Sequence, residues 1–570
     1  MFKADKIEIN DYTLLVFTKR NKNPIYVNLN EYIEDNADIL KKDITCYLNF
    51  IKLNSKLYLK FNKDFNSDEY SSIFEGNYYK TKIDDLVLIL AINKFIKKYK
   101  PRNIYIKSKN QNIYKCLKLN NKIKYKLSRK FNFSFKLNNN IFYSTLVGVY
   151  CLFKILFTFN SNKKKINILN NDILISPLSN YSIIKKKNTF LFKSNLWGKL
   201  EEEFLKLNRN ITYIHVSNIL EKKNKSLKCS NSIFSKKNNH IFFENNLSSI
   251  EKLILIKIYL SNFFYSFTKQ NFIKSKFYNK NLDINFWNIL KKNFFEGYIG
   301  FDFFSGYVHF CNFSKIFKNN KNIKNIYYLY EFQNWERIIL DIIKNDNQIK
   351  SYGIIHSSIR FWDLRFSFLS NSFYPNKFFI NSNHNLVQLK KNGFLEENLL
   401  LVESLRFNKF DNKIIKRELN TDYLIVFLDY SDDLSLELIN FLLEYDAAFK
   451  GATKFIFKKH INTKINLHQY KFKNYSITNL NIENIFNKYS KCITSNMTTA
   501  QIDILENSLD LIVLYEQNKL NLSPLYKKYD IKYARNIYDL KNFMNSKCIP
   551  SNFSYFIKSR NYKLWKKAIN

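Results

Sequence analysis

The stretch from residue 326 to residue 356, IYYLYEFQNWERIILDIIKNDNQIKSYGIIH, decides the fold. Its apolar residues form a short run at Ile326–Tyr330, recur with helical spacing at Gln333–Ile343 and form a second short run at Tyr352–Ile355. A strand, a helix and another strand in this order predict a βαβ unit, in which the two strands are parallel. The stretch therefore predicts an α/β fold.

The same alternation continues on both sides of this stretch. Two such series in tandem predict two Rossmann-like domains, at residues 170–415 and 416–570, facing a cleft where the ligands of open parallel sheets bind. Residues 1–135 are expected to form an additional N-terminal αβ region, and residues 136–169 an apolar helix and a basic linker. The other expected strands are Tyr12–Phe17, Asn103–Ile106, Asp172–Ile175, Ile211–Val216, Phe378–Ile380, Tyr423–Leu428, Lys454–Phe457, Cys492–Thr494 and Leu511–Leu514. The other expected helices are Ile83–Ile96, Trp197–Leu207, Leu253–Phe267, Leu386–Lys391, Leu434–Glu444 and Thr499–Glu506.

The chain carries a large positive charge. Its 570 residues include 91 Lys or Arg and 48 Asp or Glu, which gives a net charge of +43. Such an excess is typical of proteins that bind nucleic acid or an anionic membrane. Here it is nearly all lysine, it is scattered along the chain, and it comes with abundant Asn, Ile, Phe and Tyr. AT-rich codons encode these residues, so we interpret the charge mainly as codon bias.

Cysteines and the N-terminus indicate the compartment. The seven cysteines lie far apart, and no C-x-x-C occurs. A disulfide framework and a structural zinc site are therefore not expected, and reduced thiols in a cytosol fit better. The first residues, MFKADKIEINDYTLL, contain no apolar segment of the kind found in secretory signals. We expect a cytoplasmic protein.

The most apolar run of the chain is Ile141–Phe159. It is interrupted by one charge, Lys154, and is followed by Lys163–Lys165. Three interpretations remain open: a buried or linker helix, a helix on the membrane surface whose lysines meet anionic head groups, and a helix that spans the membrane. The second would place the protein peripherally at the inner face of the cytoplasmic membrane.

Several well-known catalytic motifs are missing. The sequence has nine glycines and contains no G-x-G-x-x-G, G-x-x-x-x-G-K-[ST], H-E-x-x-H or G-x-S-x-G. A dinucleotide-dependent dehydrogenase and a P-loop NTPase are therefore not expected. The carboxylate pair Asp432–Asp433 lies where a helix should begin, and the helix dipole explains it better than a metal ion does. We expect no metal site.

Two polar residues directly follow neighbouring strands of the first series. Glu331 comes just after Ile326–Tyr330, where a carboxylate can act as a general base toward a sugar hydroxyl. It can equally belong to the start of a helix, where acidic residues are common. His356 ends the strand Tyr352–Ile355, a better position for a site than the interior of a helix, although a single histidine is more often structural.

Two arginines follow His356 in the string R-F-W-D-L-R. Arg360 and Arg365 can bind a phosphate or a carboxylate through fork-shaped hydrogen bonding. The alternative is an ordinary salt bridge with Asp363 or another acid.

Polar residues also follow two strands of the second series. Lys458 and His460 follow the first of these strands, and the sequence from Ser495 to Thr499 leads from the other into a helix. Hydroxyl groups and free N–H groups at a helix N-terminus can bind an anion without glycine, and the two cationic side chains can add charge to the same phosphate. The alternative is plain helix capping by Ser495 or Thr498.

Three strings of the chain resemble a known family. They are Y-E-x-Q-x-W-E from Tyr330, R-F-W-D-L-R from Arg360, and V-E-x-L-R from Val402 to Arg406, with further agreement at Leu196–Gly198, His215 and Leu520–Leu525. In these strings, over roughly residues 170–545, the chain resembles bacterial surface-carbohydrate biosynthesis proteins of lipopolysaccharide and capsule clusters, which look like GT-B-type glycosyltransferases.

The resemblance implies a fold, a reaction and roles for the candidate residues. It implies two Rossmann-like domains of GT-B type and metal-independent transfer of a sugar from a nucleotide donor to a glycan or lipid-linked acceptor. The first domain would hold the acceptor, with Glu331 or His356 as the catalytic base and with Arg360, Arg365 and Trp335 at the substrate. The second would bind the donor through Lys458, His460, Ser495, Asn496, Thr498 and Thr499.

The chain departs from the family in one loop. Related transferases that use nucleotide-activated sugars, including sialyl- and Kdo-transferases, often carry K-P-H-P where this chain has Lys458-Lys459-His460-Ile461. Both prolines are missing, which leaves the donor open, with a CMP-linked sugar among the candidates. No cofactor beyond this donor is expected. Two other functions remain open: a non-catalytic nucleic-acid-binding protein and an inactive scaffold of polysaccharide assembly.

Overall fold

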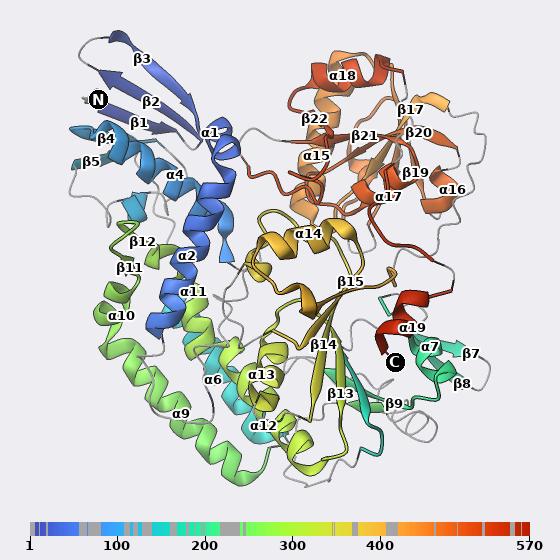
Figure 1. The fold of residues 1–570 in the computed structure, drawn as a ribbon. Coiled ribbons are helices and arrows are strands. Elements are labelled where there is room, and N and C mark those ends of the chain that lie inside the picture. Colours follow the sequence, from blue (N-terminus) through green and yellow to red (C-terminus); the bar gives the residue numbers. More distant parts are fainter. Residues whose placement is uncertain are drawn as a thin grey trace. The chain divides into compact units, whose positions relative to one another are not determined.

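The fold is seen in a computed structural model of the chain (Figure 1). It describes residues 6–10, 12–18, 21–55, 65, 81–107, 114–117, 124–127, 140–159, 168–177, 182–186, 189–194, 196–197, 200–216, 240–242, 247–344, 346, 348–367, 374–405, 420–460, 463–480, 482–486, 488–515, 519–547, 553–559 and 561–569. The chain divides into two compact units. Unit 1 comprises residues 1–356, 363–379 and 392–400, and unit 2 comprises residues 357–362, 380–391 and 401–570.

An N-terminal sheet opens unit 1. Its strands are β1 (Lys6–Asn10), β2 (Thr13–Thr18), β3 (Asn21–Asn28), β4 (Asn103–Ile106) and β5 (Lys124–Leu127), in the order β3-β2-β1-β4-β5. The first three strands are antiparallel, and β4 and β5 join them in parallel. The accompanying helices are α1 (Leu29–Asp35), α2 (Ala37–Ser55) and α4 (Ile83–Tyr99). Helix α4 has two aspartates in its first turn and two lysines in its last, which suits the helix dipole.

A group of helices forms a second part of unit 1. They are α6 (Asn140–Thr158), α9 (Ser249–Thr268), α10 (Gln270–Lys276), α11 (Trp287–Tyr298) and α12 (Phe301–Asn319). Helix α9 begins at a capping box, in which Ser248 and Glu251 satisfy each other's backbone N–H groups. Helix α11 contacts α6, α9 and α12, and α6 also contacts α9 and α12. A short ribbon of β11 (Tyr278–Asn279) and β12 (Ile284–Asn285) precedes α11.

The third part of unit 1 is a sheet of seven strands. These are β6 (Asp172–Pro177), β9 (Ile211–Val216), β10 (His240–Phe242), β13 (Asn325–Leu329), β14 (Lys350–Ile355), β15 (Lys377–Ile380) and β16 (Leu399–Leu401), in the order β10-β9-β6-β13-β14-β15-β16. The strands from β10 to β14 are parallel. From β6 the chain continues to β9 and β10 on one side, and from β13 it continues to β14, β15 and β16 on the other side. The chain therefore changes direction between the neighbouring strands β6 and β13. The hairpin β7 (Ser182–Lys186) and β8 (Thr189–Lys193) lies outside this sheet.

Both faces of this sheet are covered. The ring of Tyr327 on β13 packs against Phe204 of α7 (Leu200–Lys206), whereas the next residue, Tyr328, packs against Trp335 of α13 (Asn334–Ile343). Because successive side chains of a strand point to opposite faces, α7 and α13 lie on opposite sides of the sheet. Continuous burial along β13 follows from this arrangement.

Unit 2 contains an entirely parallel sheet of six strands. They are β17 (Asn420–Phe427), β18 (Lys454–Lys458), β19 (Tyr475–Thr478), β20 (Tyr489–Thr494), β21 (Asp510–Leu514) and β22 (Lys532–Ala534), in the order β19-β18-β17-β20-β21-β22. The helices of the unit are α14 (Asn383–Lys391), α15 (Asp432–Ala448), α16 (Ile482–Phe486), α17 (Ala500–Glu506), α18 (Ile537–Asn545) and α19 (Lys563–Ile569).

Two hydrophobic cores lie on the two faces of this second sheet. Ile425 and Phe427 belong to a core with residues of α16 and α17, and the alternate residues Leu424 and Val426 belong to a core with residues of α15 and α18. The direction of the chain changes between β17 and β20, which are neighbours in the sheet.

The α/β fold with two parallel sheets and an N-terminal αβ region is confirmed. The central βαβ unit is formed by β13, α13 and β14, with β13 and β14 paired in parallel. The apolar run Ile141–Phe159 forms α6, and the helix expected at Trp197–Leu207 begins only at Leu200. Helices α11 and α12 were not expected. The domain boundaries near residues 135, 170 and 416 and the cleft stay predictions.

Candidate active site

Glu331 lies two residues after the end of β13, beside the point where the chain changes direction between β6 and β13. Such points are where open parallel sheets bind ligands, outside the carboxyl ends of the strands. The backbone turns sharply here, because the next residue, Phe332, has a φ of 58°. This left-handed conformation is uncommon for a residue other than glycine, so it needs support from its surroundings.

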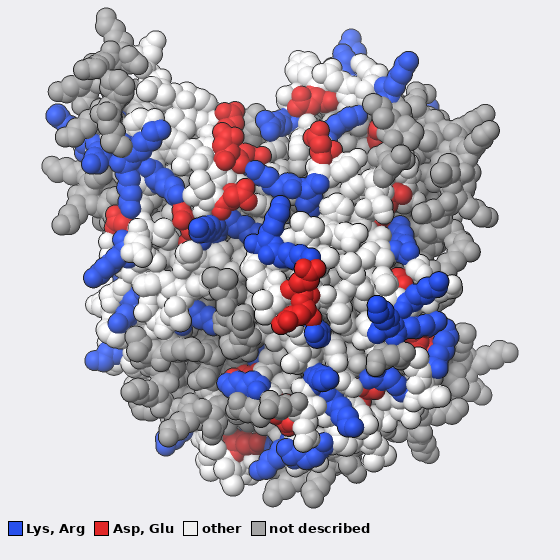
Figure 2. Space-filling view, in the orientation of Figure 1, with Lys and Arg blue, Asp and Glu red and all other residues white. Residues whose placement is uncertain are grey.

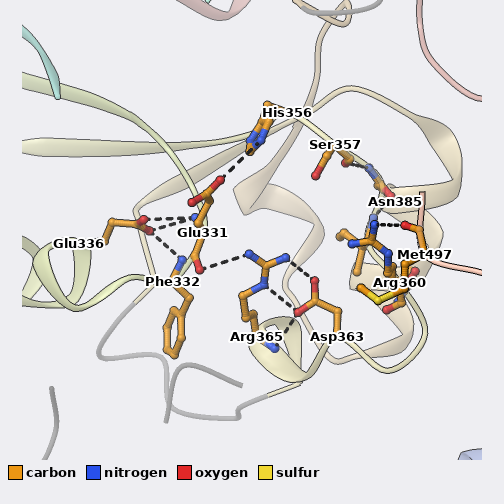
Figure 3. A network of polar contacts seen from close by, with 12 residues as sticks. Glu331, Phe332, Glu336, His356, Ser357, Arg360, Asp363, Arg365, Asn385 and Met497 are labelled. Carbon is orange, nitrogen blue, oxygen red and sulfur yellow. Dashed lines mark hydrogen bonds and ion pairs between the residues drawn. The ribbon is translucent and has the colours of Figure 1, made fainter. Parts of the chain in front are cut away.

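Glu336, on the first turn of α13, provides this support. Its carboxyl group accepts the backbone N–H of Glu331 at 3.1 Å and that of Phe332 at 2.9 Å (Figure 3). The side chain is buried, and burial raises its pKa well above the ordinary value; the nearby charge of Glu331 acts in the same direction. The second glutamate of Y-E-x-Q-x-W-E therefore positions the first.

The Glu331 carboxylate points toward the His356 imidazole. Oε1 of Glu331 lies 3.6 Å from Nε2 of His356, which follows the neighbouring strand β14 (Figure 3). Gln333 donates a hydrogen bond to the other carboxylate oxygen of Glu331. The Glu331 side chain is 37% exposed and that of His356 is 12% exposed. The structure thus brings together the two residues that the sequence singled out as candidate bases.

Arg365 is engaged in a salt bridge. Its Nε and Nη2 donate to the two carboxylate oxygens of Asp363 at 2.8 and 2.6 Å, and its Nη1 donates to the backbone oxygen of Glu331 at 3.3 Å. The Asp363 carboxylate raises the pKa of the Arg365 guanidinium above its ordinary value despite burial. This geometry corresponds to the salt-bridge alternative, and it holds the Glu331 turn from the side opposite to Glu336.

The N-terminal region contributes a lysine near this salt bridge. Lys41 on α2 interacts electrostatically with Asp363. Burial lowers the pKa of Lys41 to about 8, and the neighbouring acids oppose this shift. Nothing in the sequence indicated that residues before 135 would approach the site, because this proximity exists only in the folded chain.

Trp335 and Arg360 are held by protein groups. Trp335 is 4% exposed, and its indole N–H donates to the Gln333 side chain at 2.7 Å, so it packs within the core beside the site. Arg360, in unit 2, donates through Nη2 to the backbone oxygen of Met497 at 2.7 Å. Their contact with a substrate stays a prediction.

In unit 2, polar residues gather where the chain changes direction between β17 and β20. Ser495 follows β20, and its hydroxyl donates to Oδ2 of Asp429, which follows β17, at 2.6 Å. Both residues are buried. The sequence singled out Ser495 but not Asp429, since the two lie 66 positions apart. The available signal was an acidic residue directly after the expected strand Tyr423–Leu428.

The other candidate donor residues lie around this pair, with differing surroundings. Asn496 donates to the backbone oxygen of Leu520 at 2.9 Å, and Lys458 donates to that of Leu480 at 2.7 Å. His460 is exposed, and its ring lies 6.3 Å from that of Tyr430. Thr498 accepts the N–H of Ala500. Thr499 precedes α17, makes no capping hydrogen bond with its side chain, and introduces a helix of only seven residues.

Residues of the other family strings have structural contacts. His215 is buried beside His240, with 2.8 Å between Nε2 of the first and Nδ1 of the second. Burial lowers their pKa values to about 3 and about 4. The carboxylate of Glu403 accepts the first backbone N–H groups of α19, and its backbone oxygen accepts the indole N–H of Trp565. Gly198, Arg406 and the basic run Lys163–Lys165 lie outside the described residues.

Figure 2 shows lysines and arginines dispersed among uncharged residues on the viewed face. Within the ranges that the structure describes, no three His, Cys, Asp or Glu side chains are grouped as ligands for a metal ion.

The chain was compared with known proteins. No profile of a known family and no curated protein sequence matches it. Solved structures do: UDP-GlcNAc 2-epimerase from Methanocaldococcus jannaschii matches with a TM-score of 0.36 and 11% identity, over 70% of this chain and 97% of the other. The calicheamicin glycosyltransferase CalG4 matches with a TM-score of 0.35 and 7% identity, over 67% of this chain and 91% of the other. Anabaena HepE in complex with UDP and glucose matches with a TM-score of 0.33 and 9% identity, over 66% of this chain and 89% of the other. These TM-scores are too low to carry an argument about activity.

Proposed function

We propose that the chain is a glycosyltransferase that moves a sugar from a nucleotide-activated donor to a hydroxyl group of a surface-glycan acceptor. The observation that carries the proposal is the contact of 3.6 Å between Glu331 and His356 at the ends of two parallel strands. A positioned carboxylate beside an imidazole is suited to removing a proton from a hydroxyl group. The two parallel sheets agree with this reaction, but many functions share such sheets, so the site carries the argument.

Glu331 is the proposed base. Its carboxylate is the more exposed member of the pair, and both of its oxygens have a partner, His356 on one side and Gln333 on the other. The acceptor oxygen forms a bond to the anomeric carbon while its proton passes to Glu331. The bond from the anomeric carbon to the donor phosphate breaks, and its electron pair leaves with the phosphate. His356 helps to orient the carboxylate.

Residues of unit 2 are proposed to bind the donor. The reaction increases the negative charge of the leaving phosphate, so fixed cations and hydrogen-bond donors at this group contribute most to the rate. Lys458 and His460 supply positive charge, and Asn496, Thr498 and Thr499 supply polar groups after β20. The Ser495 hydroxyl is already used by Asp429, so its role is to fix the loop.

Donor binding is the first test. The purified full chain would be heated with UDP, GDP, TDP, CMP and their sugars, and the unfolding temperature would be measured. A ligand at about 100 times its dissociation constant adds about 2.7 kcal/mol to the free energy of unfolding. We expect a shift with one nucleotide class, and a smaller shift for Lys458→Met. The absence of any shift in folded protein would overturn the proposal and favour the scaffold or the nucleic-acid-binding hypothesis.

Turnover is the second test. With the donor identified, Glu331→Gln should lower the transfer rate by ~10²–10⁴-fold and leave the donor-induced shift intact, because it removes a base and retains the shape. Glu397→Gln, an exposed position of the same unit, is the matched control. Equal rates for the two variants would exclude Glu331 as the base.

A further inference from the structure

Helix α6 presents its large apolar side chains outward. Phe142, Leu146, Tyr150, Phe153 and Phe157 recur every three or four residues, so they form one stripe along the helix, and they are between 46% and 79% exposed. The opposite stripe is buried and includes the small residues Ser144, Gly148 and Cys151. This is the reverse of a surface helix of a globular protein, which buries its large apolar residues.

The inner stripe explains why the helix is fixed in this orientation. A side chain at Gly148 would overlap with the backbone oxygen of Ile299, at the end of α11. The Ser144 hydroxyl donates to the carboxylate of Glu296 on α11 at 3.1 Å. The close approach at Gly148 and the hydrogen bond of Ser144 fix this side of α6 against α11, so the stripe from Phe142 to Phe157 faces outward.

Helix α9 adds a second stripe of the same kind. Ile250, Leu253, Leu260, Phe264 and Phe267 are between 45% and 71% exposed, again at intervals that place them on one side of the helix. The sequence indicated an apolar helix here but gave no sign that its apolar residues face outward.

The two helices lie side by side and antiparallel. Lys252, near the start of α9, donates to the backbone oxygens of Leu156 and Phe159 at the end of α6. About two turns further along α9, the Tyr259 hydroxyl donates to the backbone oxygen of Thr145 near the start of α6. Figure 1 shows α9 along the outer edge of the helical part of unit 1. We call the two outward stripes together the α6–α9 face.

The charges around this face are almost all positive. Helix α6 contains Lys154 and no acidic residue, and residues 249–276 contain five lysines and a single acid, Glu251. The Glu251 carboxylate is already engaged by the N–H of Ser248 and by Lys315 at 2.5 Å. Two copies of such a face would bring like charges together, so pairing with a second copy is disfavoured.

We propose that the α6–α9 face docks on an anionic lipid membrane, with both helices lying along its surface. Helices that combine an aromatic apolar side with lysines bind in this way, with the apolar side among the acyl chains and the lysines at the anionic head groups. Over Ile141–Thr158, α6 also has the length and apolar composition of a helix that could cross a membrane, and only 22% of that segment is buried. The inference concerns unit 1 alone and does not depend on the proposed transfer reaction.

Vesicle binding of the full chain tests this proposal. A chain with a charge of +43 binds anionic vesicles through charge alone, so flotation should be measured at 0.3 M salt, where the screening length is well below 10 Å. We expect binding to vesicles of equal parts phosphatidylglycerol and phosphatidylcholine, and much weaker binding to phosphatidylcholine alone. The double variant Phe153→Asp, Phe264→Asp should bind at least tenfold more weakly.

A matched control separates this face from general charge. The double variant Tyr26→Asp, Leu395→Asp changes two exposed apolar residues of unit 1 outside the face by the same charge, and it should bind like the wild type. Equal losses in both variants, or no binding by the wild type, would overturn the proposal. Light scattering tests the alternative that a second copy of the chain covers this face. A wild-type dimer that becomes a monomer only in the Phe153→Asp, Phe264→Asp variant, with no vesicle binding by the wild type or the variant, would also overturn the proposal.

Discussion

Glu336 accepts the backbone N–H of Phe332 at 2.9 Å, and Phe332 has a φ of 58°. The left-handed conformation of a bulky residue is unfavourable, so this buried contact compensates for backbone strain. The same carboxyl accepts the N–H of Glu331 and thereby fixes the direction in which the Glu331 side chain leaves the sheet. Glu336 is a positioning residue, one step removed from the proposed reaction.

Replacement of Glu336 should separate its hydrogen bonds from its charge. We expect Glu336→Ala to lower the free energy of unfolding by about 1–3 kcal/mol, because two backbone N–H groups lose their acceptor, and to lower turnover as well. Glu336→Gln keeps an acceptor oxygen of the same shape and should retain most of both. Urea unfolding and the transfer assay measure the two effects. Equal behaviour of the two variants would show that the turn does not need this acceptor.

The imidazole of the candidate pair can be tested in the same assay. We expect His356→Ala to lower turnover, because the imidazole helps to orient the Glu331 carboxylate; a loss as large as ~10²–10⁴-fold would give the imidazole a share in the acid–base chemistry itself. The donor-induced thermal shift should remain, since donor binding is assigned to other residues. A folded variant with the turnover of the wild type would remove His356 from the proposed reaction.

The sheets were predictable because their strands are short apolar runs. Between these runs lie segments in which apolar residues recur with helical spacing. Asn103–Ile106 and Ile211–Val216 form strands with the expected bounds. Helix α12 was missed because apolar residues occur on nearly all of its sides, including Phe303, Phe304 and Tyr307, so the sequence shows no distinct apolar stripe. Tertiary packing, rather than a local pattern, determines such a helix.

The site was predictable only where chemistry coincided with strand ends. Glu331 and His356 follow adjacent parallel strands, and the structure places them in contact, although their roles stay predictions. The contact of Asp429 with Ser495 and the interaction of Lys41 with Asp363 join residues far apart in the sequence. Burial and distance create such pairs, and neither is visible in a single sequence.

The buried His215 and the half-buried His240 should make unit 1 sensitive to acid. The pKa values of His215 and His240 are about 3 and about 4 in the folded chain, against about 6.5 in an unfolded chain. Between pH 6.5 and 4 the unfolded state therefore binds more protons, so stability should fall as the pH falls, by up to about 1.4 kcal/mol per pH unit for each histidine. Unfolding in urea at pH 7, 6 and 5 measures this slope.

A variant assigns this slope to the pair. His215→Gln combined with His240→Gln should flatten the pH dependence, whereas His468→Gln, at an exposed position, should leave it unchanged. A slope that survives the double change would have to come from other groups.

Ser495 should matter more for stability than its neighbour Thr498. The Ser495 hydroxyl is buried and donates to the Asp429 carboxylate, whereas Thr498 accepts one N–H at 3.3 Å in a half-buried position. We expect Ser495→Ala to lower the free energy of unfolding by about 1.5–3 kcal/mol, because a buried charge loses a hydrogen bond, and Thr498→Ala to cost less. Equal effects in urea unfolding would contradict the assigned role of the Asp429–Ser495 pair.

Gly148 should be the most sensitive position of α6. A methyl group there would overlap with the backbone oxygen of Ile299, which has no side-chain freedom to move aside. Gly148→Ala would raise the helix propensity by roughly 1 kcal/mol, yet we expect a net loss of about 1–3 kcal/mol from overpacking against α11. Leu146→Ala, on the exposed stripe of the same helix, should change stability by less than about 0.5 kcal/mol. Thermal unfolding of the two variants measures the difference. A Gly148→Ala variant as stable as the wild type would show that α6 is held less closely than these contacts require, and that its outward stripe is not fixed by its small inner residues.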